Sequence, residues 1–243
     1  MSGSKFWLKF LGRGLVDLLF PPGGCLLCGN REKEGVVCRD CLSFLETART
    51  LPFCPVCGRF GEGEICLDCR IYSRPFTLCR AAGPYEGALK QAIRRLKYER
   101  KREGVEYLGG LLAEVVTREP AYQRARVVVP VPTSPERRRQ RGFDQAELLA
   151  RELAWRLGLP LCRWLKKEIP TPPQTGLGRG ERLLNLRGSF GVCQNPKLGG
   201  AVVLLVDDVF TTGSTLTAAA EALLAGGAAE VLGLVLAAAR IFT

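Results

Sequence analysis

The apolar positions of the chain follow two patterns, and each predicts a different kind of element. Short continuous runs rich in valine, leucine and alanine predict strands that are buried on both faces. Such runs span 126–131, 201–206 and 230–236, and two further strands are expected at 77–85 and 189–193. Apolar residues that recur every three or four positions predict helices at 87–98, 105–116, 145–157 and 216–224. The run 201–206 is expected to lie in a parallel sheet, because it is apolar throughout instead of alternating.

An amphipathic helix is also predicted over residues 5–20. Aromatic and leucine side chains recur there at helical spacing, with Lys5, Lys9 and Arg13 between them. The two prolines at 21 and 22 would end it. We expect this helix to pack on the protein's own surface. A helix lying on a membrane surface is the alternative, because basic and aromatic side chains also suit that setting.

Composition adds constraints on partners and location. The net charge of +11 favours polyanionic partners such as nucleotides, pyrophosphate or nucleic acid. The chain has no histidine, which removes the usual general base and leaves cysteine as the only soft metal ligand. No secretory signal and no run of about twenty apolar residues is visible, so a reducing, cytoplasmic location is expected.

Eight of the 11 cysteines form four Cys-x-x-Cys pairs. The pairs are Cys25 with Cys28, Cys38 with Cys41, Cys54 with Cys57, and Cys66 with Cys69. Two such turns complete one tetrahedral thiolate site, so the eight ligands predict two structural zinc ions. Consecutive pairing, which gives two zinc ribbons in series, is favoured over an alternating cross-brace. Cys79, Cys162 and Cys193 are expected to be ordinary buried or half-buried thiols.

The strongest candidate for a ligand site is the stretch 202–216. Asp207 and Asp208 stand where the strand 201–206 is expected to end, and a small-residue turn then precedes a helix. The turn consists of Thr211, Thr212, Gly213, Ser214 and Thr215. Backbone N–H groups and hydroxyls at a helix start suit a phosphate, and the carboxylates can accept hydrogen bonds from ribose hydroxyls while magnesium offsets their charge. An ordinary Asx turn and helix cap is the simpler alternative.

Two basic segments accompany this stretch. Segment 130–145 follows a predicted strand and is interpreted as an arginine-rich loop, placed to meet a phosphate or pyrophosphate at the carboxyl edge of the sheet. Segment 171–185 is rich in glycine, proline and arginine, and it is predicted to be a long mobile loop that acts as an active-site lid. A plain surface loop is the alternative for this second segment.

The residues 206–215, Val-Asp-Asp-Val-Phe-Thr-Thr-Gly-Ser-Thr, resemble the phosphoribosyl pyrophosphate signature of type I phosphoribosyltransferases. Together with the cysteine pairs, Val-Pro-Val-Pro at 129–132, Arg-Gly-Phe-Asp-Gln at 141–145 and Thr-Pro-Pro-Gln-Thr-Gly-Leu at 171–177, the chain is similar to the ComF family of competence proteins. The resemblance extends from about Cys25 to the end. It implies an α/β fold of the type I phosphoribosyltransferase kind, a mainly parallel sheet flanked by helices, behind an N-terminal double zinc ribbon.

The resemblance also implies roles for individual residues. Asp207 and Asp208 would hold the ribose hydroxyls, and the turn 211–215 would hold the 5-phosphate. The pyrophosphate-side loop would include Arg137, Arg141 and Gly142, and the flexible loop would include Gln174, Arg179 and Arg182. Three positions depart from the family pattern: Asp144 stands where asparagine is usual, and Lys167 and Ile169 stand where basic residues, often arginine, are found.

These features predict an N-terminal helix (1–22), a double zinc ribbon (23–75) and a phosphoribosyltransferase-like domain (76–243). The expected function is binding of phosphoribosyl pyrophosphate with magnesium, with transferase activity toward an unidentified acceptor, in DNA uptake on the cytoplasmic side of the inner membrane. A competence helicase or other DNA-uptake proteins are the protein partners that the resemblance implies. The alternative is a single-stranded DNA-binding or adaptor protein that uses the site only to sense its ligand. Candidates for stacking on bases are Phe53, Phe60, Tyr98 and Phe143.

Overall fold

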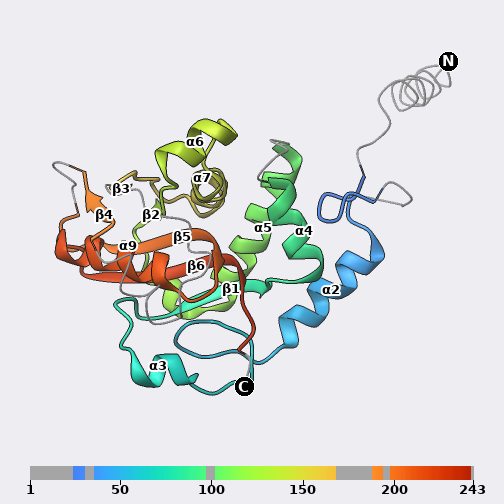
Figure 1. The fold of residues 1–243 in the computed structure, drawn as a ribbon, viewed down its shortest axis with the longest axis horizontal. Helices are drawn as coiled ribbons and strands as arrows, with labels where there is room; N and C mark the ends of the chain where they lie inside the picture. The colour runs from blue at the N-terminus through green and yellow to red at the C-terminus, as the bar shows by residue number, and fades with distance from the viewer. Residues whose placement is uncertain (1–23, 31–35, 97–101, 168–187, 194–197, 242–243) are drawn as a thin grey trace, which may run out of the picture.

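A four-stranded parallel sheet forms the centre of the molecule (Figure 1). The computed structural model describes residues 24–30, 36–96, 102–167, 188–193 and 198–241. The sheet has the order β1-β6-β5-β2. Its strands are β1 (Cys79–Pro84), β2 (Val127–Pro130), β5 (Val202–Phe210) and β6 (Glu230–Ala238). The predicted parallel sheet and the positions of its strands are therefore confirmed.

Helices and loops cover both faces of this sheet, because successive strand side chains point to opposite sides. On one face, Leu204 and Val206 pack in a cluster with α4 (Gly87–Leu96), α5 (Arg102–Arg118) and α7 (Gln145–Leu157). On the other face, Val203 and Leu205 pack with α9 (Ser214–Ala225). The remaining helical segments are α2 (Arg39–Thr50), α3 (Leu67–Ile71), α6 (Pro135–Arg141) and a 3-10 turn at Pro120–Arg124.

The strand β5 continues past the expected end at 206. Its pairing with β2 stops at Pro130 and Val206, but its pairing with β6 continues to Phe210 and Ala238. The polar pair at 207–208 suggested an end because aspartate is rare in strands. Backbone hydrogen bonds to β6 outweigh that preference. Asp207 and Asp208 are therefore held in a strand with β6 on one side and no β2 partner on the other.

The segment interpreted as an arginine-rich loop contains the short helix α6, so that part of the prediction is wrong. The Ser134 side chain caps it by accepting a hydrogen bond from the Arg137 N–H at 3.4 Å. Pro135 occupies the first turn, and Gly142 ends the helix with a φ of 75°. These are ordinary helix start and stop signals. The residues between them are mostly arginine, so no apolar periodicity indicated a helix.

A small antiparallel sheet lies beside the main one. It pairs β3 (Leu165–Lys167) with β4 (Phe190–Val192), and the predicted lid connects the two strands. Most of the lid, 168–187, lies outside the described residues, as does the predicted helix 5–20. None of the described helices is both long enough and apolar enough to cross a bilayer.

The two ribbons are integrated into the body of the protein. Apolar residues of the first ribbon share a cluster with α4 and α5, and those of the second share a cluster with the opposite sheet face. The second ribbon is also joined by backbone hydrogen bonds: the Phe60 N–H donates to Ala239 O at 3.2 Å, and the Ile241 N–H donates to Phe60 O at 2.7 Å. Phe60 thus extends the strand pairing at the end of β6.

Candidate functional site

The carboxyl edge of the sheet carries a pocket beside the free side of β5. Its walls come from the end of β2, from α6 and α7, from β3 and from the start of α9. The residues that line it are Val131, Pro132, Thr133, Arg137, Arg141, Asp144, Gln145, Ala146, Lys167, Asp207, Asp208, Val209 and Thr215. The carboxyl edge of a parallel sheet is where such folds bind ligands.

The Asp pair lies in the wall formed by β5. Asp207 Oδ1 accepts a hydrogen bond from the Asp208 N–H at 2.8 Å. Burial, followed by the charge of Asp208, raises the pKa of Asp207 well above its ordinary value. Ionising both carboxylates here is unfavourable unless hydrogen-bond donors or a cation accompany them. The pair is therefore suited to ribose hydroxyls and to a nearby divalent ion.

The turn 211–215, which we call the phosphate turn, leads directly into α9. Gly213 has a φ of 81°, and a Cβ placed on it would lie 2.2 Å from Cζ of Phe210, so only glycine fits. The N-cap position of α9 is Gly213, which has no side chain to act as a cap. The Thr212 and Ser214 hydroxyls lie 3.1 Å apart, and the Thr212 hydroxyl accepts a hydrogen bond from the Ser214 N–H at 3.4 Å. The backbone N–H groups and hydroxyls at this helix N-terminus form a site suited to a phosphate.

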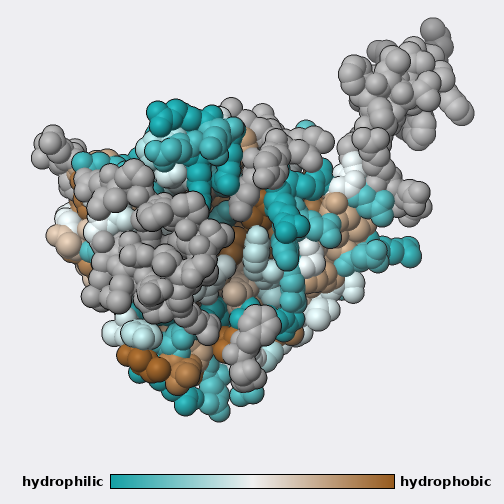
Figure 2. Space-filling model, viewed as in Figure 1, coloured by the Kyte–Doolittle hydropathy of each residue, from teal (hydrophilic) through white to brown (hydrophobic). Residues whose placement is uncertain are grey.

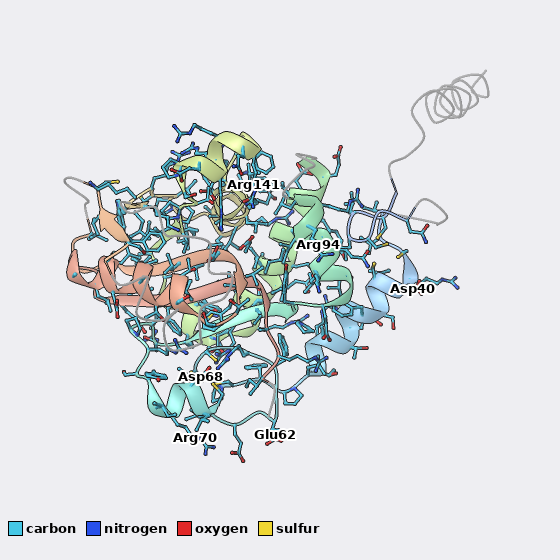
Figure 3. The ribbon with its side chains drawn as sticks, in the orientation of Figure 1. Asp40, Glu62, Asp68, Arg70, Arg94 and Arg141 are labelled. Carbon is cyan, nitrogen blue, oxygen red and sulfur yellow. The ribbon has the colours of Figure 1, made fainter. Side chains whose placement is uncertain are left out.

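Basic side chains from α6 and β3 form another wall of the pocket, which we call the basic wall. Arg137 and Arg141 come from α6, and Lys167 comes from β3. Burial, followed by the charge of Arg137, lowers the pKa of Lys167, and its Nζ lies 5.7 Å from the centroid of the Phe190 ring. Figure 2 shows a hydrophilic surface over α6, and Figure 3 shows Arg141 at the end of that helix. Anions entering the pocket would be attracted by all three cations.

Buried polar residues fix the base of this wall. Asp144 Oδ2 accepts from the Thr133 N–H at 2.7 Å, and its Oδ1 accepts from the Glu147 N–H at 3.3 Å, which caps α7. Gln145 is 3% exposed, and its Oε1 accepts from Arg141 Nη1 at 2.9 Å. Asp144 therefore ties the loop after β2 to α7, while Gln145 orients Arg141.

The structure brings most of the sequence candidates together. Arg137, Arg141, Asp207, Asp208 and Thr215 all line the pocket, and the rest of the phosphate turn adjoins it. Gly142 ends α6 without lining the pocket. The candidates of the flexible loop, Gln174, Arg179 and Arg182, lie outside the described residues.

Four polar residues of the lining were not among the binding residues predicted from sequence: Thr133, Asp144, Gln145 and Lys167. Lys167 was noted only for its departure from the family pattern, although its place just before the predicted lid was a usable signal. Gln145 begins a helix, where a polar side chain is expected to face solvent. The folding of α6 against α7 buries it instead.

The eight predicted metal ligands form two clusters. The first cluster comprises Cys25, Cys28, Cys38 and Cys41, and the second cluster comprises Cys54, Cys57, Cys66 and Cys69. Consecutive pairing is confirmed and the cross-brace is excluded. Within each cluster the sulfurs lie within 4.8 Å of one another, and the Cys28–Cys38 and Cys57–Cys66 sulfur distances are both 3.7 Å. Tetrahedral zinc with bonds of about 2.3 Å separates its sulfurs by about 3.8 Å. The spacing therefore fits two zinc ions, one per cluster.

Both clusters use the same knuckle turn. The Gly29 N–H donates to Cys25 O at 2.8 Å and the Gly58 N–H donates to Cys54 O at 2.9 Å, each with glycine at positive φ. In the first cluster, burial raises the pKa of Cys25, but backbone N–H groups outweigh it and lower that pKa to about 6. A thiolate at neutral pH is the form that binds a metal.

A buried arginine distinguishes the second cluster. Arg59 is 1% exposed; its Nη2 donates to Cys66 Sγ at 3.0 Å and to Asp68 Oδ2 at 2.6 Å. Asp68 lies beside the sulfurs of this cluster in Figure 3. The guanidinium offsets the negative charge of the thiolates, which otherwise disfavours their burial. Sequence spacing alone gave no sign of this role.

Two of the aromatic candidates for base stacking are not available at the surface. Phe60 is 3% and Phe143 8% exposed, so both belong to the core. Tyr98 lies outside the described residues. Phe53 is exposed, and the Arg80 guanidinium lies 5.1 Å from its ring centroid. The stacking prediction is therefore wrong for Phe60 and Phe143.

Comparison with protein families agrees with this geometry. Residues 15–70 match the family model of the double zinc ribbon domain, and residues 141–241 match that of the phosphoribosyl transferase domain. The chain is thus a protein of phosphoribosyltransferase fold with an N-terminal double zinc ribbon.

Curated relatives narrow the class further. Over 226 residues the chain is 30% identical to "Competence protein ComFC" of Bacillus subtilis (strain 168), a match that covers 84% of this chain and 90% of the relative. It is 31% identical over 225 residues to "DNA utilization protein YhgH" of Escherichia coli (strain K12), covering 88% and 96%. It is 29% identical over 217 residues to "Competence protein F" of Haemophilus influenzae, covering 85% and 93%. The chain belongs to the ComF family of competence proteins.

Proposed function

We propose that this protein binds phosphoribosyl pyrophosphate, or a closely related sugar phosphate, together with magnesium. The observation that carries the proposal is that three features meet at one sheet edge: the Asp pair, the phosphate turn and a basic wall. In the proposed complex Asp207 and Asp208 accept hydrogen bonds from the ribose hydroxyls, and the phosphate turn binds the 5-phosphate. Arg137, Arg141 and Lys167 face the pyrophosphate.

Magnesium fits the donor set of this pocket. Carboxylate oxygens are the ligands that this cation prefers, and it commonly bridges them to substrate phosphates. The raised pKa of Asp207 supports the same proposal, because a cation beside the pair would offset the charge that burial disfavours. When bound, magnesium would neutralise charge on the pyrophosphate.

We further propose that the site supports phosphoribosyl transfer. The basic wall would stabilise the charge that develops on departing pyrophosphate. In this transfer the bond between ribose C1 and the pyrophosphate oxygen would break while the acceptor atom bonds to C1, and pyrophosphate would leave. Since the chain contains no histidine, Asp208 is the candidate to accept the proton that the acceptor loses. A pocket that holds its ligand but lacks a competent acceptor would act as a sensor instead.

The names of the relatives suggest the process. They are called competence or DNA utilization proteins, and we propose that this chain likewise acts in DNA uptake or use, on the cytoplasmic side. A DNA-uptake helicase or another uptake protein would then be its partner.

Titration calorimetry with phosphoribosyl pyrophosphate and magnesium tests the binding proposal. Asp208→Asn removes a charge and replaces an acceptor with a donor beside the ribose, so we expect affinity to fall at least about tenfold, in line with roughly 1.5–3 kcal/mol for a hydrogen bond to a charged group. Asp40→Asn, on α2 and outside the pocket, should bind as the wild type does. Wild-type affinity in the double variant of Asp207 and Asp208 would show that the ligand lies elsewhere.

A screen of acceptors for pyrophosphate release separates the transferase from the sensor. Release that requires an acceptor, and that Asp208→Asn slows, supports transfer. Tight binding with no release from any acceptor supports sensing.

Binding of single-stranded DNA is the second candidate function, and exposed cations on α6 favour it. The Arg138 and Arg139 side chains are 63% and 78% exposed, and their carboxylate contacts are long, at 3.9 Å. Arg95, by contrast, donates to Cys25 O at 2.5 Å, so it contributes to ribbon structure. The α6 arginines are therefore the better residues with which to test DNA contact.

A further inference from the structure

Arg74 lies between the second cluster and the phosphate turn. Its Nη2 donates to Thr212 O at 3.4 Å, and its Nη1 donates to Thr217 Oγ1 at 3.3 Å. Although the Cys57 thiol and burial raise the pKa of Cys69 in the second cluster, the Arg74 guanidinium nearby acts to lower it. One side chain therefore lies near a metal ligand and hydrogen-bonds both the backbone of the phosphate turn and the first turn of α9.

The contacts connect parts of the chain that are far apart in sequence. Arg74 and Thr212 are separated by 138 positions, and Arg74 and Thr217 by 143. The guanidinium is planar and presents its donors in a fixed fork, so its two hydrogen-bond partners determine its orientation. Its Nε is buried and has no hydrogen-bond partner among the described residues. An unsatisfied buried donor costs free energy, which the two hydrogen bonds of the guanidinium must offset.

The two guanidiniums at the second cluster occupy different positions. Arg59 is fully buried among Cys57, Cys66 and Asp68 and stays within the ribbon. Arg74 is only half-buried and reaches out of the ribbon from Cys69, which is itself half-buried. Arg59 therefore serves the cluster itself, whereas Arg74 joins the cluster to the ligand pocket.

We propose that Arg74 is a positioning residue through which the second cluster sets the anion affinity of the phosphate turn. With metal bound, all four cysteines are thiolates and their negative charge holds the guanidinium in place. The guanidinium then fixes the Thr212 carbonyl, and with it the direction of the N–H groups that follow. Without the hydrogen bond from Arg74, the phosphate turn can adopt other backbone conformations, and its N–H donors no longer converge on one anion.

The first cluster provides an internal comparison. It packs with α4 and α5, in the apolar cluster on the opposite face of the sheet from α9. The arginine beside it, Arg95, donates to the backbone carbonyl of Cys25 within the first ribbon. Disturbing the first cluster should therefore leave the phosphate turn unchanged.

The test uses the full zinc-loaded chain and three measurements. Arg74→Gln removes the charge while keeping a long polar side chain. Arg70→Gln is the matched control, because Arg70 lies on the same ribbon and donates to Glu64 and to Ile65 O. Zinc content and thermal unfolding establish that each variant is folded. Hydrogen–deuterium exchange of the 211–216 amides without ligand reports the turn, and calorimetry with phosphoribosyl pyrophosphate and magnesium reports affinity.

In Arg74→Gln we expect two bound zinc ions, exchange at the phosphate turn that is about tenfold faster, and affinity that is about tenfold weaker. Arg70→Gln should match the wild type in every measurement. Wild-type exchange at 211–216 in Arg74→Gln would overturn the inference. The coupling is read from exchange without ligand, whereas the affinity rests on the proposed function. Absence of binding by the wild type would therefore refute that function and leave the exchange result to decide the coupling.

Thr217→Val addresses the case in which Arg74→Gln loses zinc. This change removes one partner of Arg74 without touching the ribbon, so two zinc ions should remain. We expect exchange at the phosphate turn to rise several-fold, because one of the bonds that holds the guanidinium is gone. Unchanged exchange in Thr217→Val, with zinc lost from Arg74→Gln, would show that Arg74 only stabilises the ribbon and would overturn the proposal.

Discussion

Asp207 carries its carboxyl in a setting that disfavours charge. Burial and then the neighbouring Asp208 raise its pKa well above the ordinary value of 3.8. Because the folded-state pKa is raised, this group lowers the stability of the free protein as pH rises from that value through the raised pKa. A cation or hydroxyl donors beside the pair favour the ionised form. Binding of the proposed ligand should therefore release a proton within this pH window, and affinity should rise with pH across it.

Calorimetry in buffers with different ionisation enthalpies measures that proton release. The Asp207→Asn variant should bind with a weaker affinity that no longer changes with pH, whereas Asp40→Asn should keep the linkage. Proton uptake on binding, or an affinity that is constant with pH in the wild type, would contradict the assignment.

Gly213 illustrates how a single residue fixes the shape of the site. Its positive φ and the ring of Phe210 both exclude a side chain, and Phe210 is itself held edge-to-face against Phe76 with centroids 6.1 Å apart. Gly158, which ends α7, also has a positive φ, of 64°, but no atom of another described residue lies within 4 Å of where its Cβ would be.

Gly158→Ala should therefore lower the free energy of unfolding by only about 1–2 kcal/mol, the cost of holding a residue with a Cβ at positive φ. Gly213→Ala should cost clearly more and should also weaken anion binding, because the ring must move. Chemical denaturation of both variants measures the difference. Equal losses would mean that the phosphate turn can shift away from Phe210.

At the scale of elements, the second ribbon belongs to the same cooperative unit as the sheet. Its cysteines pack in the hydrophobic core that also contains Val203 and Phe210. Phe60 forms backbone hydrogen bonds with the residues that follow β6. Loss of its metal should therefore destabilise the phosphoribosyltransferase fold as well as the ribbon. This differs from the behaviour of a domain attached through a linker.

Cys57→Ser tests this coupling. We expect about one zinc ion to remain per chain and the Tm of the main transition to fall by at least about 5 °C, since 1 kcal/mol corresponds to about 2–4 °C in a chain of this size. Cys162→Ser, which alters a half-buried thiol outside both clusters, should retain two zinc ions and nearly the same Tm. An unchanged main transition in zinc-depleted Cys57→Ser would show that the ribbon unfolds independently.

Elements whose signals are local could be predicted from sequence. The cysteine spacing gave both clusters, and the helix 145–157 agrees with α7 at both ends. The extension of β5 to Phe210 could not be predicted, because it depends on β6 providing partners beyond the end of β2. Short α6 was missed because seven residues are too few for a clear helical period.

The candidate site likewise has parts that could be predicted from local sequence and parts that depend on long-range contacts. The Asp pair and the phosphate turn are contiguous in sequence, so their residue types and order were enough to find them. Arg59 and Arg74 act on partners that only folding brings near, and Arg74 reaches across 138 positions to Thr212. Long-range contacts of this kind have no periodic signal in a single sequence.

At the scale of the whole molecule, the excess positive charge is placed where an extended anion could follow it. Exposed Arg138 and Arg139 lie on α6 beside the pocket, and other cations line the pocket itself. If the protein binds single-stranded DNA, the logarithm of affinity should fall linearly with the logarithm of salt concentration, by about 0.7 per phosphate contacted.

The double change Arg138→Ala and Arg139→Ala should weaken DNA binding and reduce that slope by about 0.7 for each phosphate that is no longer neutralised. Arg70→Ala is the control, since Arg70 lies on α3 at the opposite end of the molecule from Arg141 (Figure 3). Fluorescence anisotropy over a range of salt concentrations measures both quantities. No binding at low salt, or an unchanged slope in the double variant, would restrict the basic surface to the sugar-phosphate ligand.

The strand order has a consequence for how the protein is made. In the order β1-β6-β5-β2, the strand that joins β1 to β5 is β6, which is translated after the other three. Until β6 leaves the ribosome, β1 has no partner strand in the sheet and β5 has a bare hydrogen-bonding edge. The backbone hydrogen bonds of Phe60 likewise cannot form until residues 239–241 have been translated. The nascent chain therefore carries unpaired edges through most of its synthesis, a period in which aggregation and chaperone binding compete with folding.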